Sequence, residues 1–359
     1  MLTATRSISE LEKLKNALPE NEKSRFDRFF RVDTTLGCLN APASMEGWIV
    51  QNFGSLERVT SQKITKVTNL LTLEGALFNE IRASRPMERR ADDAVQQAIL
   101  QSKGDPFCQP ETGTPADVFG RIRGNHSITA SNIAKYDGYH GVVIFDEHNP
   151  LQFDQAAIAD YFETARQWGD RAHQDDPECK YFFFMWNCLW KSGASIVHGH
   201  AQMTLTRGMH YPKAEALRRT WAAYKTQYNG VCYFKDLFEV HQSLGLAWEW
   251  NGVKALAYLT PVKEKEIILI APEAGPTLYE AVYRILTNYQ KVSAISFNLA
   301  MYHPPLASTA EDWEEFPVVV RIVDRGDPNT KTTDVGAMEL YAASVISSDP
   351  FRVAEAMQQ

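Results

Sequence analysis

The stretch 187–203 reads N-C-L-W-K-S-G-A-S-I-V-H-G-H-A-Q-M, and its last six residues are the most informative part of the chain. A β-strand sends alternate side chains to opposite faces, so His198, His200 and Gln202 are expected to share one face. The intervening residues are small or apolar. Gly199, between the two histidines, suits a position where another backbone or a ligand comes close. The pattern predicts a strand with three nitrogen-bearing side chains in one row.

This row has two interpretations. A His-x-His pair on a strand is often a pair of hydrogen-bonded histidines in a core or at its rim. Burying polar groups without partners, however, costs roughly a few kcal/mol each. Here the histidines are followed by a third polar side chain and preceded by S-G-A-S and, further upstream, by Asn187 in an otherwise aromatic strand. This combination favours a site for a ligand or a metal ion.

Length and composition limit the remaining possibilities. At 359 residues, with 44% hydrophobic and 11% aromatic residues, the chain has enough apolar material for about two domains, or for one domain built by duplication. The net charge of −7 and the isoelectric point near 5.8 argue against nucleic-acid or anionic-membrane surfaces. An anionic substrate therefore needs a local basic pocket.

The cysteines and the first residues indicate the compartment. Five cysteines form an odd set without the spacing of secreted proteins, and the chain starts M-L-T-A-T-R without an apolar signal run. No window approaches about 18 consecutive apolar residues, the length of a membrane-spanning helix. We expect a cytoplasmic protein that does not associate with membranes.

Hydrophobic periodicity predicts a mixture of helices and strands. Helices are expected over 7–31 with a break near Pro19, and over 87–102, 153–168, 213–228, 277–301, 335–346 and 351–357. Strands are expected over 48–53, 64–71, 141–145, 230–240, 246–250, 255–259, 267–270 and 316–323.

Other motifs carry candidate chemistry. Arg82 and Arg85, followed by a proline, form a possible two-pronged anion clamp, although a solvated basic loop has the same composition. Asp105 and Cys108 have the separation of a metal knuckle, although a buried structural cysteine is the simpler explanation of Cys108 taken alone. His148 follows a strongly apolar strand, where a ligand can be held rigidly.

Together these motifs resemble the galactose-1-phosphate uridylyltransferase branch of the histidine-triad superfamily. That branch includes diadenosine tetraphosphate phosphorylases and sugar-nucleotide phosphorylases. H-G-H-A-Q at 198–202 resembles its His-x-His-x-Gln motif, and R-A-S-R-P at 82–86 resembles its R-A-K-R-P segment. D-P-F-C at 105–108 falls where the family has a Cys-x-x-Cys zinc knuckle, and D-E-H at 146–148 falls where it has a zinc-binding histidine. The similarity spans roughly residues 71–203.

The resemblance implies covalent catalysis. His200 would attack the α-phosphorus of a nucleoside diphosphate derivative and form a nucleotidyl-histidine, so the overall reaction would proceed in two steps. Gln202 and Ser195 would stabilise the charge that develops on the phosphate. Glutamine cannot deliver a proton to a leaving group or activate water, so an acceptor that is already ionised, phosphate or a sugar phosphate, is favoured over hydrolysis. The implied substrate contacts are Arg82, Arg85, Asn125, Asn187, Ser195 and Gln202.

The resemblance also implies a structural zinc ion. Its ligands would be Asp105, Cys108, His148 and His198, with Asp105 standing where the family has a cysteine. No second metal is expected, because the region where the uridylyltransferases have a histidine cluster reads E-F-P-V-V-V-R-I-V here. The family's hexose-contacting segment is reduced to T-T-D-V-G-A-M-E at 332–339, so galactose 1-phosphate is a poor candidate acceptor.

We therefore expect an α+β, histidine-triad-like fold with tandem halves, in which an antiparallel sheet is flanked by helices. The predicted division is an N-terminal extension (1–60), a first half with the active site (61–210) and a degenerate second half (211–359). The predicted activity is nucleotidyl transfer to a sugar 1-phosphate or to phosphate, with a nucleotide or nucleotide-sugar donor and a possible homodimer. The alternatives are a sugar-nucleotide or diadenosine tetraphosphate phosphorylase, a non-catalytic nucleotide sensor, and a zinc-stabilised interaction module.

Overall fold

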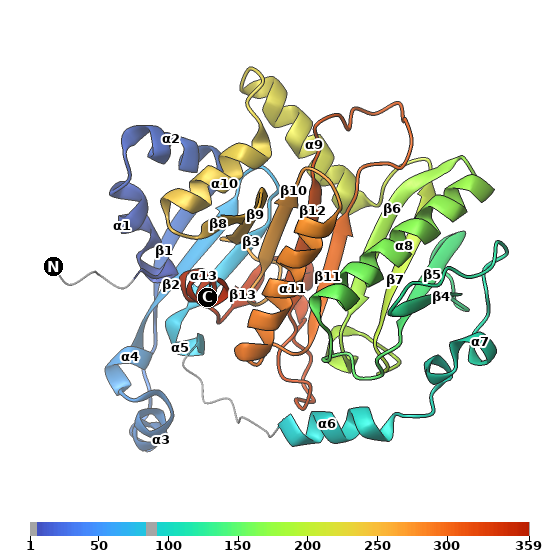
Figure 1. Ribbon diagram of the computed structural model, residues 1–359. Coiled ribbons are helices and arrows are strands. Elements are labelled where there is room, and N and C mark those ends of the chain that lie inside the picture. Colours follow the sequence, from blue (N-terminus) through green and yellow to red (C-terminus); the bar gives the residue numbers. More distant parts are fainter. Residues whose placement is uncertain (1–5, 84–91, 359) are drawn as a thin grey trace.

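The structure is a computed structural model that describes residues 6–83 and 92–358. Two mostly antiparallel sheets and the helices around them form it, so the expected α+β class is confirmed (Figure 1). The larger sheet carries the His-x-His-x-Gln motif. The smaller sheet combines strands from the beginning and the end of the described chain.

The larger sheet has nine strands, and each pair of neighbours is antiparallel. In spatial order they are β4 (Ser127–Ser131), β5 (Tyr139–Phe145), β7 (His200–Arg207), β6 (Cys179–Asn187), β11 (Phe297–Tyr302), β12 (Val318–Asp324), β10 (Ile267–Ala271), β9 (Val253–Ala257) and β8 (Ala247–Trp250). The order 4-5-7-6 on one side is mirrored by 9-10-12-11 on the other. Tandem halves joined between β6 and β11 give this arrangement, whereas the predicted boundaries at residues 60 and 210 stay predictions.

Each half sends one long helix across the same face of this sheet. α8 (Gln155–Asp175) contacts β4, β5, β6 and β7, α11 (Pro276–Lys291) contacts β9 and β10, and the two helices contact each other (Figure 1). The apolar run of β6 explains the packing, because Phe184 lies 4.6 Å from the Phe162 ring of α8, measured between ring centroids. The alternate residues of β6 point to the other face, where they are only half-buried.

That other face differs between the halves. Residues directly opposite in an antiparallel pair share a face, so Gln202, Met185, Ala300 and Arg321 form one row across β7, β6, β11 and β12. At the Arg321 end the turn between β2 and β3 covers the sheet, and Glu74 of that turn lies 2.7 Å from Arg321. At the Gln202 end the face stays open enough to leave Gln202 and Met185 half-buried.

The smaller sheet has the order β1 (Phe30–Cys38), β2 (Ser61–Asn69), β3 (Gly75–Asn79) and β13 (Ser344–Ile346). β13 joins in parallel with β3, and the other pairs are antiparallel. The β1–β2 hairpin extends away from the body and carries α3 (Ala43–Phe53) and α4 (Leu56–Thr60) at its tip (Figure 1).

The remaining helices surround the two sheets. They are α1 (Leu11–Asn16), α2 (Glu20–Phe29), α5 (Glu80–Ala83), α6 (Asp92–Gln101), α7 (Pro110–Gly113), α9 (Pro212–Gln227), α10 (Tyr233–Ser243), α12 (Ala337–Tyr341), α13 (Pro350–Met357) and the short 3₁₀ helices η1 (Ile8–Glu10), η2 (Pro106–Cys108) and η3 (Trp190–Ser192). Among the described helices, none is long and apolar enough to cross a membrane. All five cysteines carry free thiols.

Several predicted elements were wrong. Residues 48–53 and most of 230–240 are helical, in α3 and α10, although their aromatic residues favour strands. The predicted helix 277–301 ends at Lys291, and Phe297–Tyr302 pairs with both β6 and β12. The helix predicted over 335–346 is reduced to α12 and is followed by β13. In each case tertiary packing overrides a weak local preference.

Candidate active site and metal centre

The central motif adopts the predicted arrangement with one difference. β7 starts at His200, so His198 lies in the turn just before the strand. The Gly199 carbonyl accepts a hydrogen bond of 2.9 Å from the Phe145 N–H, which continues the pairing with β5. A Cβ at Gly199 would lie 2.6 Å from the Phe145 ring, closer than real Cβ contacts allow. Glycine is therefore required where these backbones approach, as the sequence predicts.

His200 is held in one tautomer. Its side chain is buried, and its Nδ1 donates a 2.8 Å hydrogen bond to the His198 carbonyl. Nε2 then carries a lone pair and no proton, as a nucleophile requires. Burial also lowers the pKa of His200 and favours the neutral ring. The Phe107 ring packs edge-on against it, with 5.1 Å between the ring centroids.

Gln202 presents one side of its carboxamide to the protein. Its Oε1 lies 2.8 Å from Nε2 of His140, which is fully buried. Among the described residues, no acceptor contacts the amide nitrogen of Gln202, which is therefore available to a ligand. The sequence alone suggests that His140 is a rim residue, so its contact with Gln202 is found only in the structure.

Asn187 is oriented by a chain of hydrogen bonds. Its Oδ1 accepts a 2.6 Å hydrogen bond from Asn298 Nδ2, and Asn298 Oδ1 accepts one of 2.5 Å from Arg325. Arg325 in turn forms a bidentate pair with Asp334, with two bonds of 2.8 Å. Because the oxygens of Asn187 and Gln202 are both engaged, each carboxamide offers its NH₂ group. The open face beside His200 is thus rich in donors, which suits an anion.

Asp105, Cys108, His148 and His198 converge on one point. Their ligand atoms all lie within 4.8 Å of one another. The two imidazole Nδ1 atoms are 3.1 Å apart, and Cys108 Sγ lies 3.4 and 3.5 Å from them. Ligands bound tetrahedrally at about 2.0–2.3 Å from a metal ion lie roughly 3.3–3.8 Å apart, so these separations are close to those of a coordination shell. The four side chains can hold a metal ion.

The hydrogen bonds around this group support the same conclusion. His148 Nε2 donates to the Ile99 carbonyl at 2.9 Å, and His198 Nε2 donates to the Phe145 carbonyl at 2.8 Å. Both Nδ1 atoms are therefore lone-pair donors that face each other, which is unfavourable unless a cation lies between them. Asp105 Oδ2 is buried without a hydrogen-bond partner, as a ligand atom would be. The donor set fits a metal ion of the zinc type.

An apolar surface lies on the other side of His200. The side chains of Ile128, Ala130, Val142 and Ile144 form a separate buried cluster, and Phe107 packs against it. Ile144 lies directly across from His200 in the β5–β7 pairing, so this surface borders the candidate nucleophile. Its four strand residues are at most 4% exposed, so the half-buried Phe107 ring is the part of this group that a ligand can contact.

The remaining predicted substrate-binding residues that the structure describes lie outside the strands of the large sheet. Ser195 is exposed in the loop before His198, and Asn125 is exposed before β4. Arg82 is exposed on α5, a helix that packs against β2 and β3 of the smaller sheet. Arg85 lies outside the described residues. Phe107, His140, Asn298 and Arg325 are the site residues that the sequence reasoning missed.

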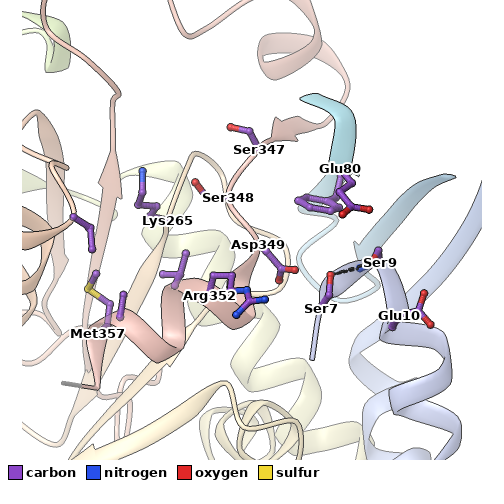
Figure 2. A pocket seen from close by; sticks show the side chains of 14 residues that line it. Ser7, Ser9, Glu10, Glu80, Lys265, Ser347, Ser348, Asp349, Arg352 and Met357 are labelled. Carbon is purple, nitrogen blue, oxygen red and sulfur yellow. Dashed lines mark hydrogen bonds between the residues drawn. The ribbon is translucent and has the colours of Figure 1, made fainter. Parts of the chain in front are cut away.

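A separate cavity of about 660 Å³ lies between the N-terminal segment and α13 (Figure 2). Ser7, Ser9, Lys265, Asp349 and Arg352 contribute polar side chains to its lining. Asp349 is already engaged, because it accepts hydrogen bonds from the Ile8 backbone N–H. None of the residues of the motif lines the cavity, and the candidate nucleophile and candidate metal ligands lie elsewhere.

No protein-family model and no curated protein matches the chain. Solved structures do resemble it. An ADP-glucose phosphorylase from Arabidopsis thaliana with bound ADP-glucose has a TM-score of 0.60 and 17% identity, over 81% of this chain and 97% of that one. A GalT-like protein from Arabidopsis thaliana has a TM-score of 0.56 and 18% identity, over 72% of this chain and 92% of that one. A uridylyltransferase has a TM-score of 0.56 and 16% identity, over 81% and 96%.

These similarities identify the fold. The chain has the histidine-triad-like fold of the uridylyltransferase and ADP-glucose phosphorylase structures, as its sequence motifs predict. At identities of 16–18% the similarity extends to the fold alone.

Proposed function

We propose that the protein is a nucleotidyltransferase or nucleotide phosphorylase that acts through a nucleotidyl-histidine at His200. The observation that carries this proposal is the arrangement around His200 Nε2. Its Nδ1 proton is bound to the His198 carbonyl, and the carboxamides of Gln202 and Asn187 beside it have only their NH₂ groups free. A neutral nucleophile next to two fixed donors suits attack on a phosphate.

The reaction proceeds in two balanced steps. In the first, the Nε2 lone pair of His200 forms a bond to the α-phosphorus, and the bond between this phosphorus and the bridging oxygen breaks. The leaving group departs with that electron pair as a phosphate or sugar phosphate. In the second, a phosphate oxygen of the acceptor attacks the same phosphorus and the P–N bond breaks, which restores the imidazole. Both leaving group and acceptor are ionised phosphates, so neither step requires a proton from Gln202.

The surrounding residues have distinct roles in this proposal. Gln202 and Asn187 donate to the non-bridging oxygens, and Ser195 in the adjacent loop adds a further donor. Arg82, Arg85 and Asn125 are assigned to substrate binding on the sequence resemblance. The half-buried Phe107 ring beside His200 accommodates the nucleobase, because a planar ring can stack on it.

Asp105, Cys108, His148 and His198 hold a zinc ion in this proposal. Three separate segments supply these ligands, so the ion has a structural role and fixes the turn that leads into β7. His198 links the two centres directly, because its side chain is a ligand and its carbonyl holds His200. If bound, the ion would supply rigidity at that turn, and the carboxylate of Asp105 and the thiolate of Cys108 would offset its charge.

The donor is a nucleoside diphosphate derivative such as a nucleotide sugar. An ADP-glucose phosphorylase of the same fold, with bound ADP-glucose, supports this class of substrate. Phosphate and a sugar 1-phosphate are both suitable acceptors, and the chemistry of His200 is the same with either. The alternative function is that of a nucleotide-binding protein without catalytic activity.

Mass spectrometry of the intact protein tests this function. The chain is mixed with UDP-sugars, GDP-sugars, ADP-sugars and diadenosine tetraphosphate, then quenched in alkali, which preserves phosphoramidates. We expect a mass increase equal to one nucleoside monophosphate, and its absence in His200→Gly. His173→Ala, which removes an imidazole from α8, is the matched control and should keep the adduct. If nucleotides stabilise the protein thermally but no donor gives an adduct, the proposed enzyme is rejected in favour of a nucleotide sensor.

A further inference from the structure

His140 lies in β5, the strand that pairs with β7, and contacts Gln202, but it has no place in the reaction as written above. It is fully buried, and burial lowers the pKa of its ring, so the imidazole is neutral. A buried polar ring must be paired, and both ring nitrogens of His140 have close neighbours. Nδ1 lies 3.0 Å from the Tyr136 backbone nitrogen, and Nε2 lies 2.8 Å from Gln202 Oε1.

The tautomer of His140 follows from its fixed neighbour. The Tyr136 backbone N–H can only donate, so Nδ1 must accept. In a neutral imidazole the proton is then on Nε2, which donates to Gln202. Asn132 Nδ2 lies 3.3 Å from the same Nε2, but two donors do not bond to each other, so the proton is directed to Gln202. The Tyr136 ring stacks on the imidazole, with 4.3 Å between centroids, and restrains its rotation.

We propose that His140 is a positioning residue that fixes the Gln202 carboxamide with its oxygen toward the protein and its NH₂ group toward the phosphate. This inference rests on the proposed function. Without a donor at the oxygen, the carboxamide can turn by about 180° because its two ends have nearly the same shape. The turned amide presents its oxygen to the phosphate and repels it. His140 therefore makes Gln202 a donor before any substrate arrives.

The loss on removing this interaction should resemble the loss of one donor to a developing oxyanion. Such a loss lowers a rate by about 10²–10³-fold. The effect should fall on the rate of nucleotide transfer to His200 at saturating donor, with little change in the donor concentration at half-saturation. A purely structural role of His140 would lower stability and would not act selectively on that rate.

The test measures the single-turnover rate of adduct formation in four variants: His140→Phe, His140→Gln, Gln202→Ala and the double variant H140F/Q202A. Phenylalanine keeps the ring and its stacking on Tyr136 but lacks the donor, whereas glutamine restores an N–H donor of similar reach. We expect H140F to be about 10²-fold slow and H140Q to recover most of that loss. H140F should add no further loss in the Q202A background.

Two results would overturn the inference. One is an H140F loss that multiplies with the Q202A loss in the double variant. The other is an H140Q variant that is as slow as H140F, although thermal unfolding shows that both are folded. If wild-type protein forms no adduct, the proposed function has failed separately, and a measurement independent of activity still tests the arrangement of His140.

That measurement is an imidazole ¹H–¹⁵N NMR spectrum of the wild-type chain labelled in its nine histidines, with the His140 signals assigned by their loss in H140F. We expect His140 to be protonated at Nε2 and not at Nδ1. Its Nε2–H resonance should move upfield in Q202A, because its acceptor is removed. A proton on Nδ1, or a resonance that Q202A leaves unchanged, would contradict the proposed contact.

Discussion

Backbone carbonyls select the tautomers of three histidines at the candidate site. His200 donates to the His198 carbonyl, His198 to the Phe145 carbonyl and His148 to the Ile99 carbonyl. His200 therefore leaves Nε2 without a proton, as the proposed nucleophile requires, whereas the other two direct Nδ1 toward the proposed metal site. Identical side chains thus acquire different chemistry from their neighbours.

Asn298 has a comparable role toward Asn187, and a substitution of equal size tests it. In Asn298→Asp the carboxylate still accepts from Arg325, but it cannot donate to Asn187 Oδ1 or to the Ser192 carbonyl. The Asn187 amide loses its fixed orientation, and two acceptor oxygens face each other. We expect adduct formation to slow by about 10–100-fold. Asn329→Asp, in the 325–336 loop, is the control, and equal rates in the two variants would exclude this role.

The sequence alone is sufficient to assign some of these residues to the candidate site, but not others. His198, His200 and Gln202 form a motif, and their spacing predicts a shared face. Asn298 and Arg325 belong to the second half, and only the β6–β11 pairing brings Asn298 opposite Asn187. His140 carries no local signal, because a histidine at the entrance of a strand can be buried or exposed.

At the level of elements, the proposed metal centre joins three segments that are far apart in the sequence. Asp105 precedes η2 and Cys108 is its last residue, His148 follows β5, and His198 precedes β7. The Asp105 side chain also caps η2 by accepting from the Phe107 N–H at 2.8 Å. One bound ion would therefore fix Phe107 over His200 and fix the start of β7 together.

Cys108→Ser should lower metal content and stability together. The hydroxyl is a poor zinc ligand, so three weakly bound segments separate and the free energy of unfolding falls by about 3 kcal/mol or more. Cys232→Ser, another exposed thiol, is the control and should change neither quantity. Elemental analysis and urea unfolding measure the two effects. Unchanged metal content in C108S would mean that the metal assignment is wrong.

The contact between β5 and α8 gives a second prediction at this scale. A Cβ on Gly141 would lie 2.7 Å from both the Trp168 ring and the Met203 methyl group, inside the packed core. Gly141→Ala should therefore destabilise the fold by about 1–3 kcal/mol, because both neighbours are fully buried. Gly138→Ala, where nothing lies within 4 Å, should be close to neutral. Urea midpoints compare the two variants, and equal midpoints would refute the packing argument.

Some helices and strands could be predicted from the sequence more accurately than others. β5, α9 and β12 follow the hydrophobic pattern within two residues, whereas α8 continues past the predicted end at 168 to Asp175. α3 and α10 were predicted as strands because aromatic residues have high β-propensity, and α10 is set by burial of Phe234 and Phe238 against its neighbours. The pairing of β13 with β3 carries no local signal at all.

Across the whole molecule, the mirrored strand order gives the two halves different tasks. The open face of the first half holds the candidate site, whereas the equivalent face of the second half is closed by the ion pairs of Arg321 with Glu74 and Glu266. The duplication could be anticipated from the order of predicted elements. The closed face could not, because Glu74 belongs to the N-terminal sheet.

Buried histidines predict how overall stability depends on pH. Burial lowers the pKa of His241 to about 4, and its nitrogens are paired with the Leu237 carbonyl and the Leu259 N–H. The unfolded chain takes up a proton near pH 6.5 and the native ring does not, so this contribution is complete above pH 6.5 and declines as the pH falls toward 4. The loss is about 1.4 kcal/mol per pH unit for this residue.

The pKa of His210 and of His303 is also lowered to about 4, which steepens the decline. Urea unfolding at about pH 7.5, 6.5 and 5.5 measures the slope. His241→Gln, which keeps an amide donor and acceptor without a titrating ring, should reduce that slope. If the variant and the wild type lose stability equally between the lower two pH values, His241 is not the source.

The parallel pairing of β13 with β3 also bears on how the protein is made. β3 leaves the ribosome early, but Ser344–Ile346 follows only after both halves of the large sheet have been synthesised. Until then one edge of β3 has unpaired backbone groups that any other extended chain can occupy. The backbone N–H of Ile8 likewise donates to the carboxylate of Asp349, which is synthesised only near the end of the chain. The nascent protein thus has an unpaired, aggregation-prone strand edge through most of its synthesis, and chaperones would act during that interval.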